Sequence, residues 1–302
     1  MIRVAAVQVA PVFLDLAKSL DRLEEWTAKA AATGARLVVF GETWLPGYPA
    51  WLDSCPEAAL WAHPGAKALY TRLTQNAVEI PGAAFDRLAR IAREAGVVLA
   101  VGAHERAGRS LYCSLLVLGP DGTLLNRHRK LKPTYGERLV WGDGDAAGLR
   151  VVDTPVGRVG GLVCWEHWLP LARQALHDGQ EQIHIALWPG VQEMHQVASR
   201  HYAFEGRCFV IAAGSLLRRA DMPTELPVAS KYDGPPEQLM IPGGSAIIGP
   251  NGKYLAGPVY ETEAIVSADL DLDLITGESL TLDVSGHYSR PDLFEFKVRT
   301  TA

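Results

Sequence analysis

Cys164 occupies a position from which a thiol can act as a nucleophile. It follows the strand-like run 160–163 and precedes the segment 165–170, so we expect it at a strand-to-helix corner. A thiol there is accessible at a sheet edge, and nearby backbone N–H groups can lower its pKa and bind an oxyanion. A small buried hydrophobe is the alternative interpretation, and we adopt it for the other three cysteines, Cys55, Cys113 and Cys208.

Two charged residues also lie at predicted strand ends. Glu42 comes just after the apolar run 37–40, and Lys130 ends the second strand of a predicted hairpin. Taken alone, each would be an ordinary surface charge, because charged side chains are mostly exposed. A thiolate, however, needs a base that removes its proton and a group that stabilises negative charge. Together with Cys164, the two residues supply both at strand ends, where α/β folds collect their active sites.

Other kinds of catalytic site lack their motifs. His167 is only three residues from Cys164 and is predicted to point away around the first helical turn, so a Cys–His pair is disfavoured. The chain has no H-E-x-x-H or C-x-x-C spacing for a metal. The stretch 156–161 does not match G-x-G-x-x-G, the dinucleotide-binding fingerprint. We therefore expect no metal and no cofactor.

Strand-like and helix-like segments alternate along the chain and then do so a second time. The first half has strands at 3–9, 35–40 and 97–101, helices at 16–34 and 85–96, and a hairpin turn at 119–122. The second half has strands at 158–163, 183–188 and 208–213, helices at 169–177 and 192–206, and a similar turn at 249–252. This repetition predicts an α/β protein with two related sheets on one core and helices outside, a four-layer α-β-β-α sandwich. Because no linker separates the halves, we expect a single domain over residues 1–302.

Composition restricts the partners. The 302 residues are 48% hydrophobic and 21% charged, as in soluble globular proteins. With 29 Lys and Arg against 34 Asp and Glu, the net charge of −5 argues against a nucleic-acid partner. No stretch approaches the roughly 20 apolar residues of a membrane helix, so we expect no membrane partner. The four widely spaced cysteines fit a reducing compartment, and we expect a cytoplasmic protein.

The trio Glu42, Lys130 and Cys164 in these settings resembles the nitrilase superfamily of carbon–nitrogen hydrolases, whose triad is Glu-Lys-Cys. The resemblance runs from residues 4–8 to residues 283–292 and therefore covers nearly the whole chain. It implies the α-β-β-α sandwich, in agreement with the layers predicted above. Cys-Trp-Glu followed by Pro170 resembles the true nitrilases, as do the segments 45–49, 129–134 and 286–288. His167 departs from that branch, since many nitrilases have Asn there and His is found in arylacetonitrile- and cyanide-degrading members.

The resemblance implies hydrolysis of a nitrile to a carboxylic acid and ammonia through a thioimidate and a thioester on Cys164. Glu42 would serve as the acid and base, and Lys130, with the backbone N–H of Trp165, would stabilise charge on the reacting atoms. Glu137 matches the second glutamate of the family, which positions the lysine or the substrate; a solvated loop charge is the alternative. Tyr48, Trp165 and Trp188 are candidates for the wall of an apolar substrate pocket, with core packing as the alternative.

Other functions stay open on the sequence. An amidase or a cyanide-degrading hydrolase would keep the triad and differ only in the pocket. A non-catalytic family member is a third possibility, which the intact Glu42, Lys130 and Cys164 oppose. Family members pair through helices beside the active site, and the predicted helix 192–206 carries Val197, Tyr202 and Phe204 among charged residues. Since the chain stops soon after residue 292, we expect a homodimer or a small even-numbered oligomer rather than a long filament.

Overall fold

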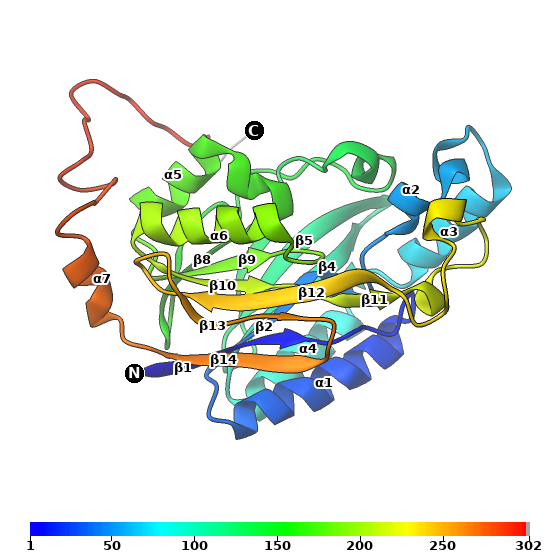
Figure 1. The fold of residues 1–302 in the computed structure, drawn as a ribbon, viewed down its shortest axis with the longest axis horizontal. Helices are drawn as coiled ribbons and strands as arrows, with labels where there is room; N and C mark the ends of the chain where they lie inside the picture. The colour runs from blue at the N-terminus through cyan, green and yellow to red at the C-terminus, as the bar shows by residue number, and fades with distance from the viewer. Residues whose placement is uncertain (300–302) are drawn as a thin grey trace.

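The computed structural model describes residues 1–299, which form two seven-stranded sheets packed face to face (Figure 1). The order of the first sheet is β14 (Ala264–Leu270), β1 (Ile2–Gln8), β2 (Leu37–Leu45), β4 (Val98–Ala107), β5 (Ser110–Leu118) and β6 (Leu124–Arg129), with β3 (Val78–Glu79) beside β4. The order of the second sheet is β11 (Leu216–Arg218), β12 (Leu239–Ile248), β10 (Phe209–Ala213), β9 (Ile183–Leu187), β8 (Gly157–Val163) and β7 (Val152–Thr154), with β13 (Tyr254–Tyr260) beside β12.

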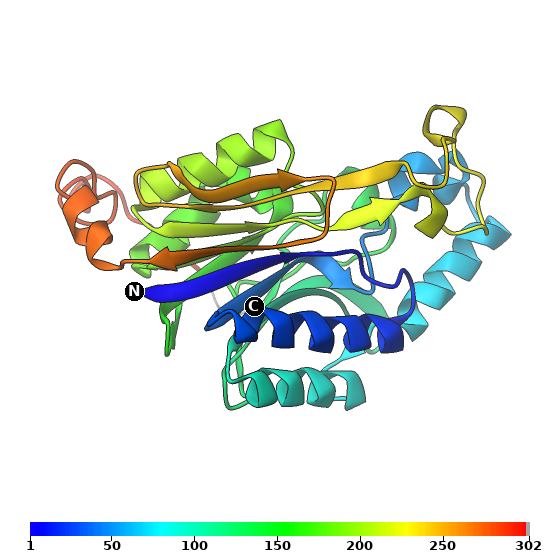
Figure 2. The same ribbon diagram turned by 60° about the horizontal axis from the view of Figure 1, so that its bottom comes forward.

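Helices cover the outer face of each sheet, which completes four layers (Figure 2). The first sheet is covered by α1 (Leu16–Ala32) and α4 (Ala83–Ala95), and the second by α5 (Pro170–Asp178) and α6 (Glu193–Gly206). The remaining helices are α2 (Trp51–Ser54), α3 (Pro64–Gln75) and α7 (Asp273–Glu278). Short 3-10 segments are η1 (Pro56–Ala59), η2 (Tyr135–Leu139), η3 (Cys164–Trp168), η4 (Arg219–Asp221) and η5 (Ser230–Tyr232). The predicted α-β-β-α sandwich is therefore confirmed.

Strand β1 shows why the central strands are apolar throughout. Val4 and Ala6 belong to the apolar cluster that also contains the second sheet, whereas Ala5 and Val7 belong to the cluster that contains Leu23 of α1. Successive side chains of a strand point to opposite faces, so a strand between two apolar layers needs apolar residues at every position.

Several features of the fold were not predicted, among them the short elements β7, β11 and α7. The segment between β2 and α4 carries α2, η1, α3 and β3, none of which the sequence patterns indicated. The last strand, β14, leaves the second half and pairs antiparallel with β1, so that Ile2 faces Leu270 in the ladder. The two halves are thus joined through the sheet as well as through the shared core.

One residue of the predicted helix 192–206 has a different environment from the one expected. Val197 and Phe204 are half-exposed on α6, but Tyr202 is completely buried and donates a hydrogen bond to the carboxylate of Glu181. The expectation that Tyr202 contributes to an exposed mixed surface is therefore wrong, because it lies on the inward side of the helix.

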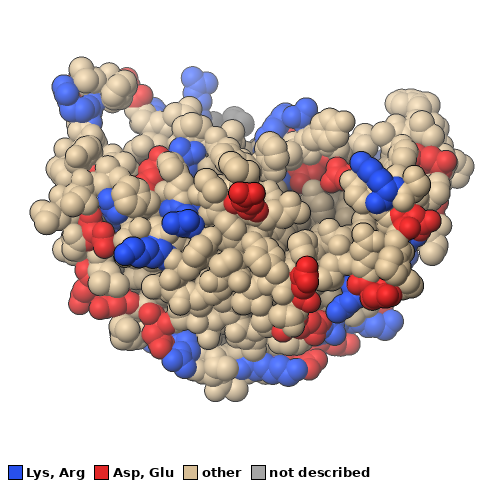
Figure 3. Space-filling view, in the orientation of Figure 1, with Lys and Arg blue, Asp and Glu red and all other residues tan. Residues whose placement is uncertain are grey.

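Acidic and basic side chains are interspersed over the face drawn in Figure 3, and neither kind forms a large patch there. Within residues 1–299 no helix combines the length and the apolar character that crossing a membrane requires.

Candidate active site

Strands of both sheets bring the predicted triad together. Lys130 directly follows β6, and Cys164 directly follows β8 of the other sheet. The expectation that Glu42 comes after the end of its strand is wrong, because β2 continues to Leu45 and contains it. One carboxylate oxygen of Glu42, one of Glu137 and the thiol of Cys164 all lie within 4.8 Å of one another. All four side chains are buried, so none of them is the surface charge or the solvated loop charge considered as alternatives.

Glu42 is held in a dry environment by its strand. Its backbone N–H donates to the carbonyl of Trp188 at 3.0 Å, which ties β2 to the second sheet. A Cβ at Gly102, on the neighbouring strand β4, would collide with the backbone of residues 41–43, so glycine is what allows β4 to pass so close. Burial raises the pKa of Glu42 to about 7, against the opposing effect of Lys130. A carboxyl with that pKa can both accept and return a proton near neutral pH.

The ammonium of Lys130 lies between two carboxylates. Its Nζ donates to Glu42 Oε1 at 2.9 Å and to Glu137 Oε2 at 2.6 Å. Burial alone would lower its pKa, but the charges of Cys164, Glu42 and Glu137 raise the pKa of Lys130 well above its usual value. Lys130 therefore stays charged across the physiological range.

Glu137 connects the lysine to its own loop and to the cavity wall. Its Oε2 also accepts the backbone N–H of Thr134 at 2.6 Å, within a capping box that begins η2. Its Oε1 accepts the hydroxyl of Tyr48 at 2.9 Å. These contacts agree with the predicted positioning role for Glu137.

Cys164 begins η3 with a backbone φ of 55°, in the left-handed region that non-glycine residues adopt rarely. Its pKa is raised well above the ordinary value, first by burial and then by the negative charge of Glu42. The expectation that the strand-to-helix corner lowers this pKa is therefore wrong, because burial and the negative charge of Glu42 outweigh the lowering effect of the Lys130 charge. The resting thiol keeps its proton and depends on a base to lose it. Within residues 1–299, Glu42 Oε2 is buried without a hydrogen-bond partner, and it is the free atom of the adjacent carboxylate.

Glu166 is an important residue that the sequence analysis did not select. Its two oxygens accept the backbone N–H of Val163 and that of Leu131, each at 2.7 Å, and Oε2 lies 2.9 Å from Nε2 of His128. Leu131 follows the lysine and Val163 precedes the nucleophile, so one carboxylate fixes both loops. The sequence did hold a signal for this role. Glu166 comes three residues after Val163, the last residue of the strand, which is the spacing at which a glutamate accepts the backbone N–H of the capping residue.

Cys113 was expected to be a core residue, and it is buried on β5. It also contributes to the site, since its thiol donates to Glu42 Oε1 at 3.6 Å and its carbonyl accepts the backbone N–H of Lys130 at 2.7 Å.

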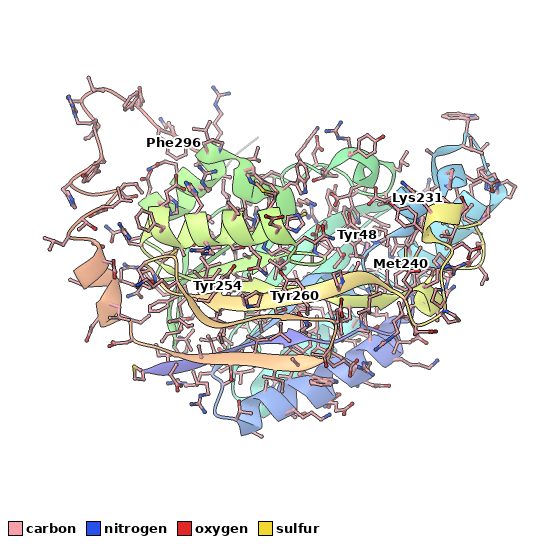
Figure 4. All side chains as sticks on the ribbon, viewed as in Figure 1. Tyr48, Lys231, Met240, Tyr254, Tyr260 and Phe296 are labelled. Carbon is pink, nitrogen blue, oxygen red and sulfur yellow. The ribbon has the colours of Figure 1, made fainter. Side chains whose placement is uncertain are left out.

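A cavity of about 740 Å³ opens above Cys164. Its wall includes Tyr48, which follows β2, and Met240 of β12, both labelled in Figure 4. Trp165 also lines it and is half-exposed. Two of the three predicted pocket aromatics therefore face the cavity.

Trp188 does not line this cavity. Its indole is completely buried, donates to Ser199 Oγ at 3.2 Å, and stacks between His167 and His195 at centroid distances of 4.6 and 4.5 Å. The prediction of Trp188 as a substrate contact is wrong, because its strand end directs the ring into the core. His195 lies between Trp188 and the cavity and forms part of the wall.

Glu42, Glu137 and Cys164 are close enough together to be considered as metal ligands. The Lys130 ammonium, however, already donates to both carboxylates and supplies the positive charge between them. A buried thiol, a carboxyl of raised pKa and a fixed ammonium at the floor of a cavity define a candidate cysteine-hydrolase centre.

Comparison with known proteins places this centre in a family. The family model described as carbon-nitrogen hydrolase matches residues 3–277. The chain is 39% identical to a bifunctional nitrilase/nitrile hydratase of Lupinus angustifolius, over 99% of this chain and 86% of that protein. It is 41% identical to Nitrilase 2 of an unknown prokaryotic organism (98% and 92% covered) and 38% identical to an aliphatic nitrilase of Sinorhizobium fredii (98% and 95%). The chain belongs to the carbon–nitrogen hydrolase family, the nitrilase superfamily, and to its nitrilase branch.

Solved structures agree on the fold. A Saccharomyces cerevisiae member of branch 10 of the nitrilase superfamily superimposes with a TM-score of 0.73 at 18% identity, covering 95% of this chain and 96% of that one. A carbon-nitrogen hydrolase of Helicobacter pylori gives a TM-score of 0.72 at 19% identity, covering 96% of each chain.

Proposed function

We propose that this protein hydrolyses an organic nitrile to its carboxylic acid and ammonia, with Cys164 as the nucleophile. The observation that carries the proposal is the contact group at the cavity floor: Lys130 Nζ lies 2.9 Å from Glu42 and 2.6 Å from Glu137, with the Cys164 thiol beside both carboxylates. The relatives named nitrilases, at 38–41% identity over nearly the whole chain, support the nitrile as the substrate.

The first half of the reaction forms a covalent thioimidate. Glu42 accepts the thiol proton of Cys164, and the thiolate adds to the nitrile carbon. The nitrile nitrogen takes a proton back from Glu42, while Lys130 and the backbone N–H of Trp165 donate hydrogen bonds to the charge that develops. Because the thiol of Cys164 has a raised pKa, proton transfer to Glu42 must accompany the attack.

The second half consumes two water molecules. Glu42 removes a proton from the first water as it adds to the thioimidate carbon, giving a tetrahedral intermediate that carries sulfur, oxygen and nitrogen. Breakage of its C–N bond, with proton transfer to nitrogen, releases ammonia and leaves a thioester. The second water cleaves the thioester, which yields the carboxylic acid and restores the thiol.

An amide is a second product that the same intermediate allows. If the C–S bond of the tetrahedral intermediate breaks instead of the C–N bond, the amide leaves and the thiol is regenerated. The relative from Lupinus angustifolius is named a bifunctional nitrilase/nitrile hydratase, which favours testing for this product.

The cavity supports an organic nitrile over cyanide. Its volume of about 740 Å³ is within the range of small-molecule sites and far exceeds what a diatomic ion fills. Met240 and Ile241 line it beside Tyr48 and Trp165, so an apolar or aromatic substrate body fits its wall.

The test measures ammonia, acid and amide release from a panel of aliphatic, aromatic and arylacetic nitriles, their matched amides, and cyanide. We expect turnover of nitriles and none of their amides. The variant Cys164→Ala should reduce turnover below detection, whereas Cys208→Ala, which removes an equally buried thiol outside the site, should retain most activity. Turnover by Cys164→Ala would contradict the mechanism, and turnover of amides alone would assign an amidase.

A further inference from the structure

A line of buried polar side chains starts at Cys164 and leads away from the cavity. His167 Nδ1 lies 2.6 Å from the carbonyl oxygen of Cys164, and His167 Nε2 lies 3.0 Å from Nε2 of His184. On its other side, His184 Nδ1 lies 2.9 Å from Oε2 of Glu181. Tyr202 donates its hydroxyl to the second oxygen of Glu181. Neither ring nitrogen of His167 contacts the thiol, so this line plays no part in the steps above.

The hydrogen-bonding groups fix the number of protons that this line holds. A carbonyl oxygen only accepts, so Nδ1 of His167 must carry a proton. The contact between the two Nε2 atoms needs one proton, on either ring. An ionised Glu181 also only accepts, so Nδ1 of His184 must carry a third proton. Two neutral imidazole rings carry only two protons between them, and the pair therefore holds one positive charge, which Glu181 balances.

We propose that His167, His184 and Glu181 are positioning residues that hold three protons in a hydrogen-bonded string and thereby fix the carbonyl of Cys164, and with it the thiol. The proposal rests on the proposed role of Cys164 as the nucleophile.

The backbone at Cys164 explains why such support is needed. Its φ of 55° is unfavourable for a residue with a Cβ and persists only where the surroundings hold it. The string holds the carbonyl on one side of the thiol, while Glu166 holds the N–H of Val163 on the other. His167 also stacks on Trp188, whose other face stacks on His195 of the cavity wall. Movement of His167 would therefore disturb both the nucleophile and the wall.

The charged groups around the string are arranged to keep Glu181 ionised. Although burial raises it, the charge of His184 and the imidazole of His177, whose Nδ1 lies 3.5 Å from Oε1, lower the pKa of Glu181 to about 2. Burial lowers the pKa of His167 and of His184, and for His184 the charge of Glu181 opposes that effect. Burial therefore opposes the shared positive charge, and the acceptors at the two ends of the string, the Cys164 carbonyl and the Glu181 carboxylate, are what require it. The other titratable groups facing the string are Glu166 from η3, Arg173 and His177 from α5, and Tyr202 and Glu205 from α6.

Two variants of His184 separate positioning from packing. His184→Leu fills the space but cannot donate to His167 or to Glu181. We expect kcat to fall by about 10²-fold, since small displacements of a reacting group cost that much, with KM within about threefold. His184→Gln keeps an amide donor near the position of Nε2 and should recover kcat to within about tenfold of wild type. His287→Leu, an exposed histidine outside the string, is the matched control and should keep wild-type kcat.

Two further readouts do not depend on nitrile turnover. The rate of Cys164 alkylation by iodoacetamide, followed by peptide mass mapping, should fall in His184→Leu and recover in His184→Gln. Nitrogen-15 spectra of histidine-labelled wild-type protein should show one ring charge shared by His167 and His184, assigned through the loss of signals in the variants. If nitriles are not turned over while Cys164 alkylation falls in His184→Leu and recovers in His184→Gln, the proposed function is contradicted and the positioning role of the string is supported. Unchanged alkylation in a folded His184→Leu, or two neutral rings in the spectra, would overturn the string.

Discussion

At the scale of single residues, the position of Lys130 between two carboxylates determines which groups can react. Its Nζ donates hydrogen bonds to Glu42 and to Glu137. Glu137 also accepts hydrogen bonds from the hydroxyl of Tyr48 and from the backbone N–H of Thr134. Glu42 by contrast keeps Oε2 without a partner among residues 1–299. Glu137 is therefore fully engaged in holding the lysine, and Glu42 is the carboxylate with an atom available for proton transfer.

This arrangement predicts that the shape of the Lys130 side chain matters as well as its charge. In Lys130→Arg a broad planar guanidinium replaces a compact ammonium that has no exposed surface. We expect kcat to fall by about 10²–10³-fold, the cost of losing one aligned donor to the reacting charge. Lys132→Arg, an exposed lysine two residues away, is the control. A Lys130→Arg enzyme with wild-type kinetics would show that Lys130 is a peripheral charge.

The raised pKa of Glu42 predicts the acidic side of the pH profile. Glu42 accepts the thiol proton only when ionised, so kcat/KM should fall as the pH drops through about 7, the value to which burial raises its pKa. The apparent midpoint belongs to the coupled group of Glu42, Lys130 and Cys164 rather than to one residue. Lys130 stays charged, so it adds no alkaline loss near neutrality. Profiles of kcat/KM from about pH 5 to about pH 9 test this, and constant activity down to about pH 5 would contradict it.

The same shift has the opposite effect on stability. The folded protein binds the Glu42 proton more tightly than the unfolded chain does, so this group stabilises the fold below its ordinary pKa of 4.5. That contribution is lost as the pH rises through about 7. The ionised base that catalysis needs is therefore formed at a cost in folding free energy.

At the scale of elements, the site depends on the loops that follow β6 and β8. Strand ends could be predicted from apolar runs, and Lys130 and Cys164 could be placed on them from sequence alone. Glu42 could not, because β2 continues past the apolar run to Leu45. The direction of Trp188 could not, because a strand end does not reveal which face its next side chain takes. The role of Glu166 was also hidden, since Val163 ends β8 whereas Leu131 lies in the loop after β6 of the other sheet.

Glu166 therefore offers a test of how these loops are held. Glu166→Gln keeps the shape but points an amide N–H₂ at one of two backbone donors, which leaves a buried N–H unpaired. We expect the free energy of unfolding to fall by about 1–3 kcal/mol. We also expect kcat to fall by about 10²-fold, because Lys130 and Cys164 lose their fixed separation.

Denaturant unfolding and nitrile kinetics measure the two effects of Glu166→Gln. The control is Glu94→Gln, at an exposed position on α4. If Glu166→Gln matched this control in both measurements, Glu166 would not link the two loops.

At the scale of the whole molecule, the repeated order of strands and helices predicted the layers because each half must cover its own sheet. Local patterns did not reveal that β14 returns to β1, since the pairing of Ile2 with Leu270 joins residues at opposite ends of the chain. The elements between β2 and α4 were also not predicted, because their local pattern is weak. Its α3 buries only Leu69 and Leu73, which is too few apolar positions to give a clear helical period.

The outer face of the second sheet predicts how copies of this chain associate. Helices α5 and α6 expose Leu171, Met194, Val197 and Phe204, which are large apolar side chains. An isologous contact uses the same patch twice, so it closes as a dimer and packs the partner subunit against α6, the helix that carries His195 of the cavity wall. We expect light scattering to give an even multiple of the 32.7 kDa chain. Val197→Asp introduces two charges into that contact and should shift the mass toward the monomer with loss of activity. Leu255→Asp, at a similarly exposed position on β13, should leave the mass unchanged. A stable and active wild-type monomer would contradict the dimer, and megadalton helical particles would contradict a small closed oligomer.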